Sequence, residues 1–510
     1  MKKILRFLGS RFFLGALCIL LEFAQLLAVY ILLYEFFLPI TILAWLFHIA
    51  VLLYLINRNE IPEFKMPWLI VLFIVPVIGA FVFMLLSSND TSKKVYVRSE
   101  KATKDMEPYQ QQTSQIDCLK RQNTDAWLQA NYLYSSAGMP CYGNSTTTYY
   151  PIGEDFHAVL LDELKKAEHF IFMEYFIVQK GAMWDPIHEV LKEKAAQGVE
   201  IYFMYDDFGC IATLPWHYHE ILNSEGIHCI ISNKFSPVLS HIHNNRDHRK
   251  ITVIDGEVGF TGGINLADEY INAVVKYGHW KDTAMKIEGE AVKNLMVLFL
   301  TSWNTQSKES PLDYAKYMNI TSRNTDGKGI VIPFGAGPSP IYKENIGKNV
   351  YLNMINAAKE YLYITTPYLV CDHELLDALC LAAKKGVDVR IITPHIPDKP
   401  VIFWMTRSSY KVLLDSSVKI YEYTPGFIHA KNFVCDDKFA VCGTINLDYR
   451  SLVHHFECGA WMYDTDCIAD MKTDFLNTAA KSGEIDGKKA VMRRWQKLIA
   501  EVIKVFSPLF

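Results

Sequence analysis

The sequence has little charge and no long basic segment. Charged residues make up 21% of the 510 residues, and the formal net charge is −4. Proteins that bind nucleic acid usually carry a basic face or run, because contacts with phosphates supply much of their affinity. The composition therefore argues against a nucleic-acid partner.

Closely spaced cysteine pairs are also missing. The chain contains 11 cysteines, but none forms a CxxC pair or a tight framework. Free thiols are typical of a reducing compartment. His241, His243 and His248 lie close together, yet no cysteine or carboxylate stands at a familiar zinc-ligand spacing from them. The sequence therefore predicts no metal site and no cofactor.

Long apolar runs are concentrated in the first 90 residues. The segment 12–56 contains only two acidic residues, Glu22 and Glu35, and is long enough for two crossings of about 20 residues each. A third apolar run follows it. We therefore expect residues 1–90 to form a membrane region with about three transmembrane helices, near 12–33, 37–56 and 67–86.

Basic residues do not settle the orientation of these helices. With three crossings, one face of the membrane would carry Lys2, Lys3, Arg6, Arg11, Arg58 and Lys65, and the other Lys93, Lys94, Arg98, Lys101 and Lys104. Six basic residues against five decide nothing under the positive-inside rule. Because free cysteines suit a reducing compartment, we expect the rest of the chain to lie on the cytoplasmic side of a cell membrane.

The second half of the chain repeats the first. KEYLYITTPYLV (359–370) answers AEHFIFMEYFIV (167–178), and AVCGTINLDYR (440–450) answers GFTGGINLADEY (259–270). Strand-like and helix-like segments alternate in both halves, which favours parallel α/β sheets.

The repeat predicts an α/β fold of two similar domains that pack as a pseudo-dimer. We place the first domain at 135–320 and the second at 330–485, with residues 91–134 as a linker from the membrane region. A C-terminal amphipathic helix is expected at 488–510. Its apolar and basic residues fit either an anionic lipid surface or packing against the helix's own domain.

Each half carries the same unusual spacing of His, Lys and Asp, in DHRKITVID and IHAKNFVCD. Alternate side chains of a strand share a face, so His248 and Lys250 point the same way, as do His429 and Lys431. Two such pairs brought together would form a phosphate site. The ammonium groups would neutralise phosphate oxygens, while the imidazoles would serve attack and proton transfer on opposite sides of phosphorus.

Other polar residues of the repeat could support such a site. The turn carboxylates Asp255 and Asp436 can fix a turn or pair with a cation. The amides of Asn265 and Asn446 can donate to phosphate oxygens. On the next strands, the carboxylates of Asp282 and Glu457 can orient the imidazoles.

Small residues and one buried acid complete the candidate residues. Gly262–Gly263 and Gly443–Thr444 are expected to leave room for close approach of the substrate. Glu174 stands in a buried-strand pattern, where it either binds a buried partner or lines a pocket near the lysines.

The doubled HxKxxxxD motif resembles the phospholipase D superfamily, and the chain is more narrowly similar to bacterial cardiolipin synthases. The similarity extends over nearly the whole chain, including PWLIVLFIVPVIGAFVFMLL, MEYF, RDHRKITVIDGEVGFTGGINLADEY and the closing FSPLF. Two features depart from the family. An additional apolar run, 12–33, precedes the two usual membrane helices, and HHFE places His455 where many members have Asn.

The resemblance implies a phosphatidyltransferase without a metal. It would join two phosphatidylglycerol molecules into cardiolipin and glycerol through a phosphohistidine. The catalytic residues carried over are His248, Lys250, Asp255, His429, Lys431 and Asp436. Family analogy makes His248 the nucleophile and His429 the acid and base, although the residues alone do not order them. A membrane-bound phospholipase D hydrolase and another phosphatidyltransferase stay open as alternatives.

Overall fold

The protein is described by a computed structural model that covers residues 20–28, 38–59, 61–86, 93–234, 245–307, 310–320, 325–487 and 489–509. These residues fall into two compact units. The N-terminal unit lies within 1–89 and 502–510, and the sheet unit lies within 90–236 and 243–501.

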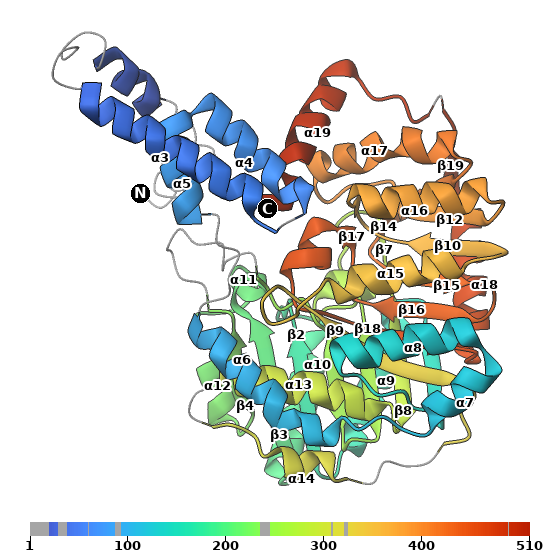
Figure 1. Ribbon diagram of the computed structural model, residues 1–510. Helices are drawn as coiled ribbons and strands as arrows, with labels where there is room; N and C mark the ends of the chain where they lie inside the picture. Colours follow the sequence, from blue (N-terminus) through green and yellow to red (C-terminus); the bar gives the residue numbers. More distant parts are fainter. Residues whose placement is uncertain are drawn as a thin grey trace. The chain divides into compact units, whose positions relative to one another are not determined.

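The sheet unit contains two mixed sheets, one teal to yellow-green and the other yellow to red in Figure 1. They share one strand order, to which the second sheet adds the edge strand β19 (Ser482–Ile485). The first runs β1 (Ser145–Tyr150), β8 (Ala284–Gly289), β6 (Val258–Gly262), β5 (Ile251–Ile254), β2 (Phe170–Tyr175), β3 (Glu200–Asp206) and β4 (His228–Ser232). The second runs β9 (Ile330–Ala336), β18 (Glu457–Tyr463), β16 (Phe439–Gly443), β15 (Asn432–Cys435), β10 (Tyr361–Thr365), β12 (Asp388–Pro394), β13 (Lys419–Tyr423) and β19 (Ser482–Ile485).

The parallel arrangement predicted from sequence is correct for only part of each sheet. Strands β2, β3 and β4 are parallel, as are β10, β12 and β13. Strands β5 and β15, which follow the His–Lys pairs, run antiparallel to β2 and β10. They continue as hairpins into β6 and β16, and a hairpin needs only a short turn.

Helices cover the sheets and also join the two halves. Those of the first half are α9 (Gly153–Lys166), α10 (Trp184–Ala196), α11 (Asp207–Cys210), α12 (Tyr218–Ser224), α13 (Val292–Gln306) and α14 (Tyr314–Met318). Those of the second half are α15 (Ile346–Ala357), α16 (His373–Lys384), α17 (Pro400–Asp415) and α18 (Cys467–Ala480).

Helices α13 and α18 each reach across the repeat boundary. Helix α13 packs against β9 of the second half, and α18 packs against β1 of the first. The sequence of α13 is apolar on nearly every side, and most of its residues are buried. One continuous core therefore includes residues of both halves.

The segment predicted as a linker is instead folded against this core. Residues 93–137 form α6 (Lys93–Met106), η1 (Glu107–Tyr109), α7 (Gln115–Gln122) and α8 (Thr124–Ala137). Met106, Leu119 and Leu133 are buried in the shared core. The Trp461 indole on β18 also donates a hydrogen bond to the Gln129 side chain on α8, at 3.0 Å.

The N-terminal unit differs from the prediction of three membrane helices. Helix α3 (Leu38–Asn57) is the one helix in the described residues that is long and apolar enough to cross a membrane. The single helix predicted at 67–86 is wrong, because α4 (Pro62–Ile74) and α5 (Pro76–Leu86) are separate helices. Residues 20–28 are helical, and the rest of the predicted 12–33 helix lies outside the described residues.

The chain closes with α19 (Arg494–Phe506) and η5 (Ser507–Leu509), within the segment predicted as an amphipathic helix. Trp495 of α19 packs edge-on against Trp404 of α17, with ring centroids 5.3 Å apart. Leu498 and Val502 remain 67% and 52% exposed. The helix thus combines one contact with its own domain and an uncovered apolar face.

Candidate active site

Each His–Lys segment forms a backbone hydrogen bond with the opposite half of the sheet unit. The His248 N–H donates to the Phe456 carbonyl at 2.8 Å, and the His429 N–H donates to the Lys281 carbonyl at 2.7 Å. The second contact extends a short parallel pair between β14 (Gly426–Ile428) and β7 (His279–Lys281). Each segment therefore docks on the strand of the opposite half that leads to a candidate carboxylate.

This docking pairs each imidazole with a carboxylate of the other half. His248 Nδ1 lies 2.9 Å from Glu457 Oε2, and His429 Nδ1 lies 2.6 Å from Asp282 Oδ2. Glu457 and Asp282 are fully buried, while the two histidines are 7% and 8% exposed. Because Nδ1 faces a carboxylate in both pairs, Nε2 is the nitrogen left to face a substrate.

Two buried ammonium groups accompany the imidazoles. Lys250 Nζ lies 2.5 Å from the His248 carbonyl, and Lys431 Nζ contacts the carbonyl and ring of His429. Burial lowers the pKa of Lys250 to about 7 and that of Lys431 to about 8, although the buried carboxylates partly oppose the shift. A phosphodiester would favour the charged form of both lysines.

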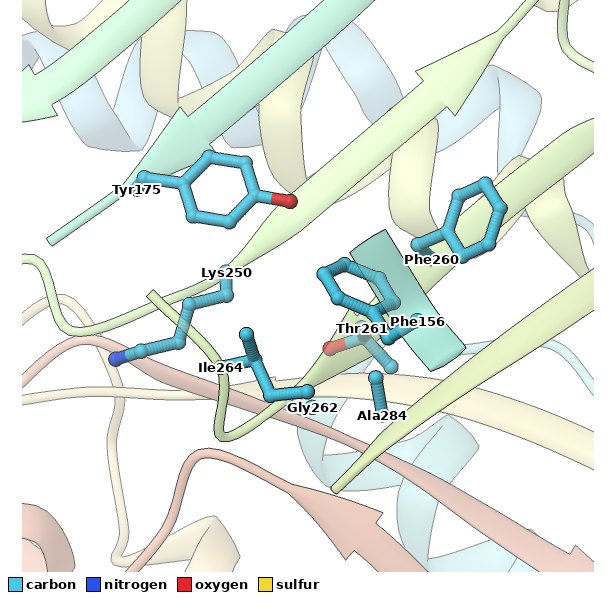
Figure 2. A pocket seen from close by; sticks show the side chains of 8 residues that line it. All are labelled: Phe156, Tyr175, Lys250, Phe260, Thr261, Gly262, Ile264 and Ala284. Carbon is cyan, nitrogen blue, oxygen red and sulfur yellow. The ribbon is translucent and has the colours of Figure 1, made fainter. Parts of the chain in front are cut away.

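Lys250 lines a narrow, mainly apolar crevice that has no room for a water molecule. The lining residues are Phe156, Tyr175, Lys250, Phe260, Thr261, Gly262, Ile264 and Ala284. Figure 2 shows the ammonium group of Lys250 pointing away from Phe156 and Phe260. The other lining residues thus lie to one side of Lys250, and its charged end is turned from the apolar wall.

Both imidazoles are held in the neutral form. Burial lowers the pKa of His248 to about 3, with Glu457 opposing the shift and Lys250 adding to it. Burial, Lys431 and Lys250 together hold the pKa of His429 well below its usual range. An anion bound between the lysines would offset this repulsion and favour a proton on imidazole.

The two carboxylates differ in their surroundings. Burial raises the pKa of Asp282 to about 6, although Lys431 and the Thr283 N–H partly counteract it. Burial acts on Glu457 too, but its contacts with His248 and His455 outweigh it and hold its pKa well below the usual range. Glu457 is therefore ionised at neutral pH, whereas the raised pKa of Asp282 lies close to neutrality.

A glycine and a threonine at equivalent positions add to this difference. Thr444 donates its hydroxyl to Glu457 Oε2. Its counterpart is Gly263, where an added Cβ would lie 2.1 Å from Asp282 Oδ1. Gly263 therefore makes room for a carboxylate, rather than for the substrate as expected from sequence.

The turn aspartates of the motif anchor the backbone. Asp255 accepts hydrogen bonds of 2.7–2.8 Å from the N–H groups of residues 168–170, and Asp436 accepts bonds of 2.7–2.9 Å from those of residues 359–361. Both have φ near 52°, in the left-handed region that Asp tolerates better than most residues. Their observed contacts join β5 to the start of β2 and β15 to the start of β10.

The two asparagines have different surroundings. Asn265 Oδ1 accepts from the Ile177 N–H at 3.0 Å, and its Nδ2 donates to the Tyr270 hydroxyl at 2.7 Å. Asn446 is also buried, but its Oδ1 has no hydrogen-bond partner within the described residues. Asn446 is therefore the more available of the two for a ligand.

His455 is a polar residue whose role sequence reasoning left open. It is 7% exposed, and its Nδ1 lies 3.5 Å from Glu457 Oε1, while neither ring nitrogen meets the geometry of a hydrogen bond in the part of the chain that the structure describes. Its ring centroid lies 5.5 Å from that of His248. The corresponding neighbour of His429 is Trp280, with centroids also 5.5 Å apart. His455, which stands where many family members have Asn, thus lies beside a candidate catalytic imidazole.

One group of side chains in the described residues could hold a metal ion. Ligand atoms of His248, His455 and Glu457 lie within 4.8 Å of one another. Two imidazoles and a carboxylate form a donor set that suits zinc. A metal there would compete for the nitrogen that His248 turns toward Glu457.

Glu174 belongs to a buried ion network beside the first His–Lys segment. Its Oε1 lies 2.8 Å from the Arg249 guanidinium, which also binds Asp247. Because Arg249 is flanked by His248 and Lys250, the network fixes the backbone from which both side chains project. The structure gives Glu174 a buried cation as partner.

Comparisons with known proteins match this chain over nearly its whole length. The family described as "Cardiolipin synthase, PLD-like domain" matches residues 351–479. A cardiolipin synthase of Alkalihalophilus pseudofirmus is 34% identical over 90% of this chain and 91% of that protein. The chain belongs to the cardiolipin synthase family.

Two further comparisons concern a relative and a solved structure. An uncharacterized protein of Streptococcus mutans is 42% identical over 90% of this chain and 100% of its own length. The fold is similar to that of a Haemophilus influenzae phosphatidylserine synthase, with a TM-score of 0.56, 15% identity and coverage of 75% and 97% of the two chains. The fold resemblance accords with the paired α/β sheets.

Proposed function

We propose that this protein is a cardiolipin synthase, which transfers a phosphatidyl group from one phosphatidylglycerol to another and releases glycerol. Membership of the family supports the reaction. The crossed pairs His248–Glu457 and His429–Asp282 support the chemistry. The charge of Lys431 acts on Lys250, and that of Lys250 acts on His429, as expected of one buried cluster built from both halves.

In the first step, His248 Nε2 attacks the phosphorus of a phosphatidylglycerol. The bond from phosphorus to the headgroup glycerol oxygen breaks as the P–N bond forms. That oxygen takes a proton from His429, which is protonated when the anionic lipid binds between the lysines. Lys250 and Lys431 neutralise the non-bridging oxygens, which is electrostatic stabilisation by groups that are already in place. Glu457 keeps the proton on Nδ1 of His248, so that Nε2 carries the attacking lone pair.

In the second step, a glycerol hydroxyl of another phosphatidylglycerol gives its proton to His429 and attacks phosphorus. The P–N bond breaks, cardiolipin leaves, and both histidines return to their starting states. Asp282, with a pKa raised by burial to about 6, is suited to a partner that alternates between neutral and charged imidazole.

The remaining site residues have supporting roles in this proposal. Asp255 and Asp436 position the strands that carry the motif through their backbone contacts. Asn446 accepts a hydrogen bond from a headgroup hydroxyl through its Oδ1, while Asn265 holds the loop of the first half. His455 contributes a hydrogen bond to the glycerol of a bound lipid. A metal is not part of the mechanism, because one bound by His455 and Glu457 would take the His248 nitrogen.

A membrane-bound hydrolase is the alternative, with water as acceptor in the second step. The site's burial favours transfer, because exclusion of water protects the intermediate. We further propose a multi-pass protein of the cell membrane, with α3 as one of its spans. The anchor would keep the site at a surface where acceptor lipid is concentrated.

The deciding experiment is a lipid assay with the full-length protein in detergent micelles and phosphatidylglycerol as the only lipid. Transfer predicts cardiolipin and glycerol in equal amounts, with little phosphatidic acid. Formation of phosphatidic acid without cardiolipin would refute the synthase assignment in favour of hydrolysis. The His248→Ala variant, prepared in the same way, controls for a contaminating activity.

A further inference from the structure

The apolar segment that follows α3 folds back on itself. Helix α4 ends at Ile74, Val75 leaves the helical conformation with φ −131° and ψ 75°, and Pro76 begins α5. The rings of Trp68 and Phe83 are 5.3 Å apart. In a continuous helix, 15 residues would separate them by about 22 Å. The two helices are therefore the arms of a hairpin.

Neither arm is long enough to cross a membrane. The arms contain 13 and 11 residues, which correspond to about 20 and 17 Å at 1.5 Å per residue. The hydrocarbon core of a bilayer is about 30 Å thick. The bend between the arms is nevertheless strongly apolar, since Phe73 and Ile74 are 86% and 62% exposed. An exposed apolar tip on short apolar arms fits insertion into part of a bilayer.

Contacts with α3 place the tip of the hairpin level with the middle of that helix. His48 lies midway along α3, and its Nδ1 is 2.8 Å from the Pro76 carbonyl at the tip. The Lys65 ammonium near the start of α4 donates to the Ile56 carbonyl at the end of α3, at 2.9 Å. Helix α4 thus runs from the end of α3 back to its middle.

The second arm returns toward the same end of α3. After Pro76 contacts the middle of α3, Phe83 on α5 lies 6.3 Å from Tyr54, between ring centroids. Gly79 permits the close approach of the arms, because an added Cβ would lie 3.0 Å from the Val71 carbonyl oxygen. From the tip to Leu86 is a rise of about 15 Å, half the thickness of the hydrocarbon core.

Backbone groups at the bend are compatible with a lipid environment. Polar backbone groups must be satisfied within the protein at this depth. Pro76 has no N–H, the Val75 N–H donates to Val71 at 2.9 Å, and the Val75 carbonyl accepts from Gly79 at 2.7 Å. His48 supplies a further partner to the Pro76 carbonyl.

We propose that α4 and α5 form a re-entrant hairpin, inserted into one leaflet beside the spanning helix α3, with its two ends at the same face of the membrane. The partner of this surface is the acyl-chain region of that leaflet. The segments before α4 and after α5 then lie on one side, together with the sheet unit that follows them in sequence.

With this topology, the distribution of basic residues favours one orientation in the membrane. One face now holds Arg58, Lys65, Lys93, Lys94, Arg98, Lys101 and Lys104, where three crossings divided them. The other four basic residues, Lys2, Lys3, Arg6 and Arg11, precede the predicted crossing at 12–33, which would bring them to the same face. Residues 34–37 contain no Lys or Arg. The positive-inside rule then assigns this face, and the sheet unit, to the cytoplasm.

Protease accessibility of the full-length protein tests both parts of the inference. One variant carries a protease site between residues 57 and 62, another between 87 and 92, and a control between 34 and 37. Each is treated with protease in intact spheroplasts and in inverted membrane vesicles. We expect the first two sites to be cut only in inverted vesicles and the control site only in spheroplasts.

Cleavage of the first two sites from opposite faces would overturn the hairpin. Cleavage of both only in spheroplasts would overturn the cytoplasmic assignment. Labelling of the unmodified chain with a membrane-impermeant amine reagent guards against misfolded insertions, because peptides containing Lys65, Lys93 and Lys94 should be modified from the same face. The micelle assay is independent of topology, so this inference and the proposed function can fail separately.

Discussion

The His248 and His429 sides of the site share one backbone plan but differ in the groups around the imidazoles. In both, the histidine docks on the opposite half and turns Nδ1 to a buried carboxylate. Thr444 and His455 surround Glu457, whereas Gly263 and Trp280 hold the matching positions on the other side. Both halves thus place their histidine in the same way, and a few side chains make the surroundings of the two imidazoles different.

The difference supports distinct roles. The ionised Glu457 suits an imidazole that must keep its Nδ1 proton while Nε2 attacks. Asp282, whose pKa burial raises to about 6, and the ammonium of Lys431 beside the ring suit an imidazole that gains and loses a proton. We therefore propose that His248 makes the nucleophilic attack and that His429 transfers the proton.

The largest expected effect is loss of either histidine, and a substrate with a good leaving group distinguishes them. His248→Ala and His429→Ala should each reduce turnover of phosphatidylglycerol by about 10⁶-fold, as in other nucleophile–base sets. With phosphatidyl-p-nitrophenol, which needs no protonation of its leaving group, His429→Ala should release a burst of p-nitrophenol and retain a phosphohistidine. His248→Ala should give neither. A burst from His248→Ala instead would reverse the two roles.

Loss of a carboxylate comes next in size. Glu457→Gln and Asp282→Asn keep the shape but remove the acceptor that fixes the Nδ1 proton, so we expect losses of about 10⁴-fold in kcat. With the p-nitrophenol substrate, the burst should be slowed by Glu457→Gln much more than by Asp282→Asn. Equal slowing of the burst by both variants would contradict the proposal that His248, the partner of Glu457, is the nucleophile.

The lysines predict the alkaline side of the pH profile. Burial lowers the pKa of Lys250 to about 7 and that of Lys431 to about 8, so the protonated fraction of each, and with it phosphate binding, should fall as pH rises through these values. The kcat/KM for phosphatidylglycerol should therefore decrease in two steps, near pH 7 and near pH 8. Lys431→Met should cost roughly 10²–10³ in rate at neutral pH and remove the step near pH 8, leaving the step of Lys250.

Lys472→Met provides a matched control for the lysine prediction. Lys472 pairs with Asp437 at the surface, so its loss should leave the pH profile unchanged. A step near pH 8 that persists in Lys431→Met would assign that titration to another group.

A smaller effect is expected from the threonine. Thr444→Gly gives the Glu457 side the residue found on the Asp282 side, and it removes a hydroxyl that donates to a charged acceptor. Such a bond contributes about 1.5 kcal/mol or more, so kcat should fall roughly ten-fold. The decrease should lie in the burst rate. Thr444→Ser, which keeps the hydroxyl, should retain nearly full activity, and a ten-fold loss there would point to packing instead.

The smallest effect is expected at His455. His455→Trp copies the neighbour of His429 and removes the proposed hydrogen bond to glycerol. We expect a several-fold increase in KM for phosphatidylglycerol with little change in kcat, while His455→Asn should restore most of the affinity. A kcat loss comparable to that of Glu457→Gln would show that His455 acts on the carboxylate rather than on substrate.

Much of the fold could be read from the repeated sequence, but the exchange between halves could not. Repeats identify equivalent strands, such as those before Asp282 and Glu457, without saying on which half each His segment docks. The alignment of the two repeats by sequence is also wrong by one position. It pairs Ala167 with Lys359, whereas the hydrogen bonds to Asp255 and Asp436 make Glu168 the equivalent of Lys359. A period-2 pattern is weak where both strand faces are buried, as in β2 and β10.

Hydrophobicity alone also concealed the break at Val75. Residues 67–86 are apolar throughout, so the run resembles one crossing, and only Pro76 near its middle indicates otherwise. The helices at 93–137 were missed for the opposite reason. Their polar composition resembles a linker, although widely spaced residues such as Met106, Leu119 and Leu133 are buried in the core.

The crossing of each histidine to the partner half's carboxylate constrains how such a chain arose. A single-copy ancestor could have completed this arrangement only as a symmetric homodimer, with the rotation axis passing between its two imidazoles. Gene fusion would then have freed the two copies to diverge, and Gly263 opposite Thr444 records that freedom. Either half expressed alone would therefore lack a complete catalytic pair, however well it folded.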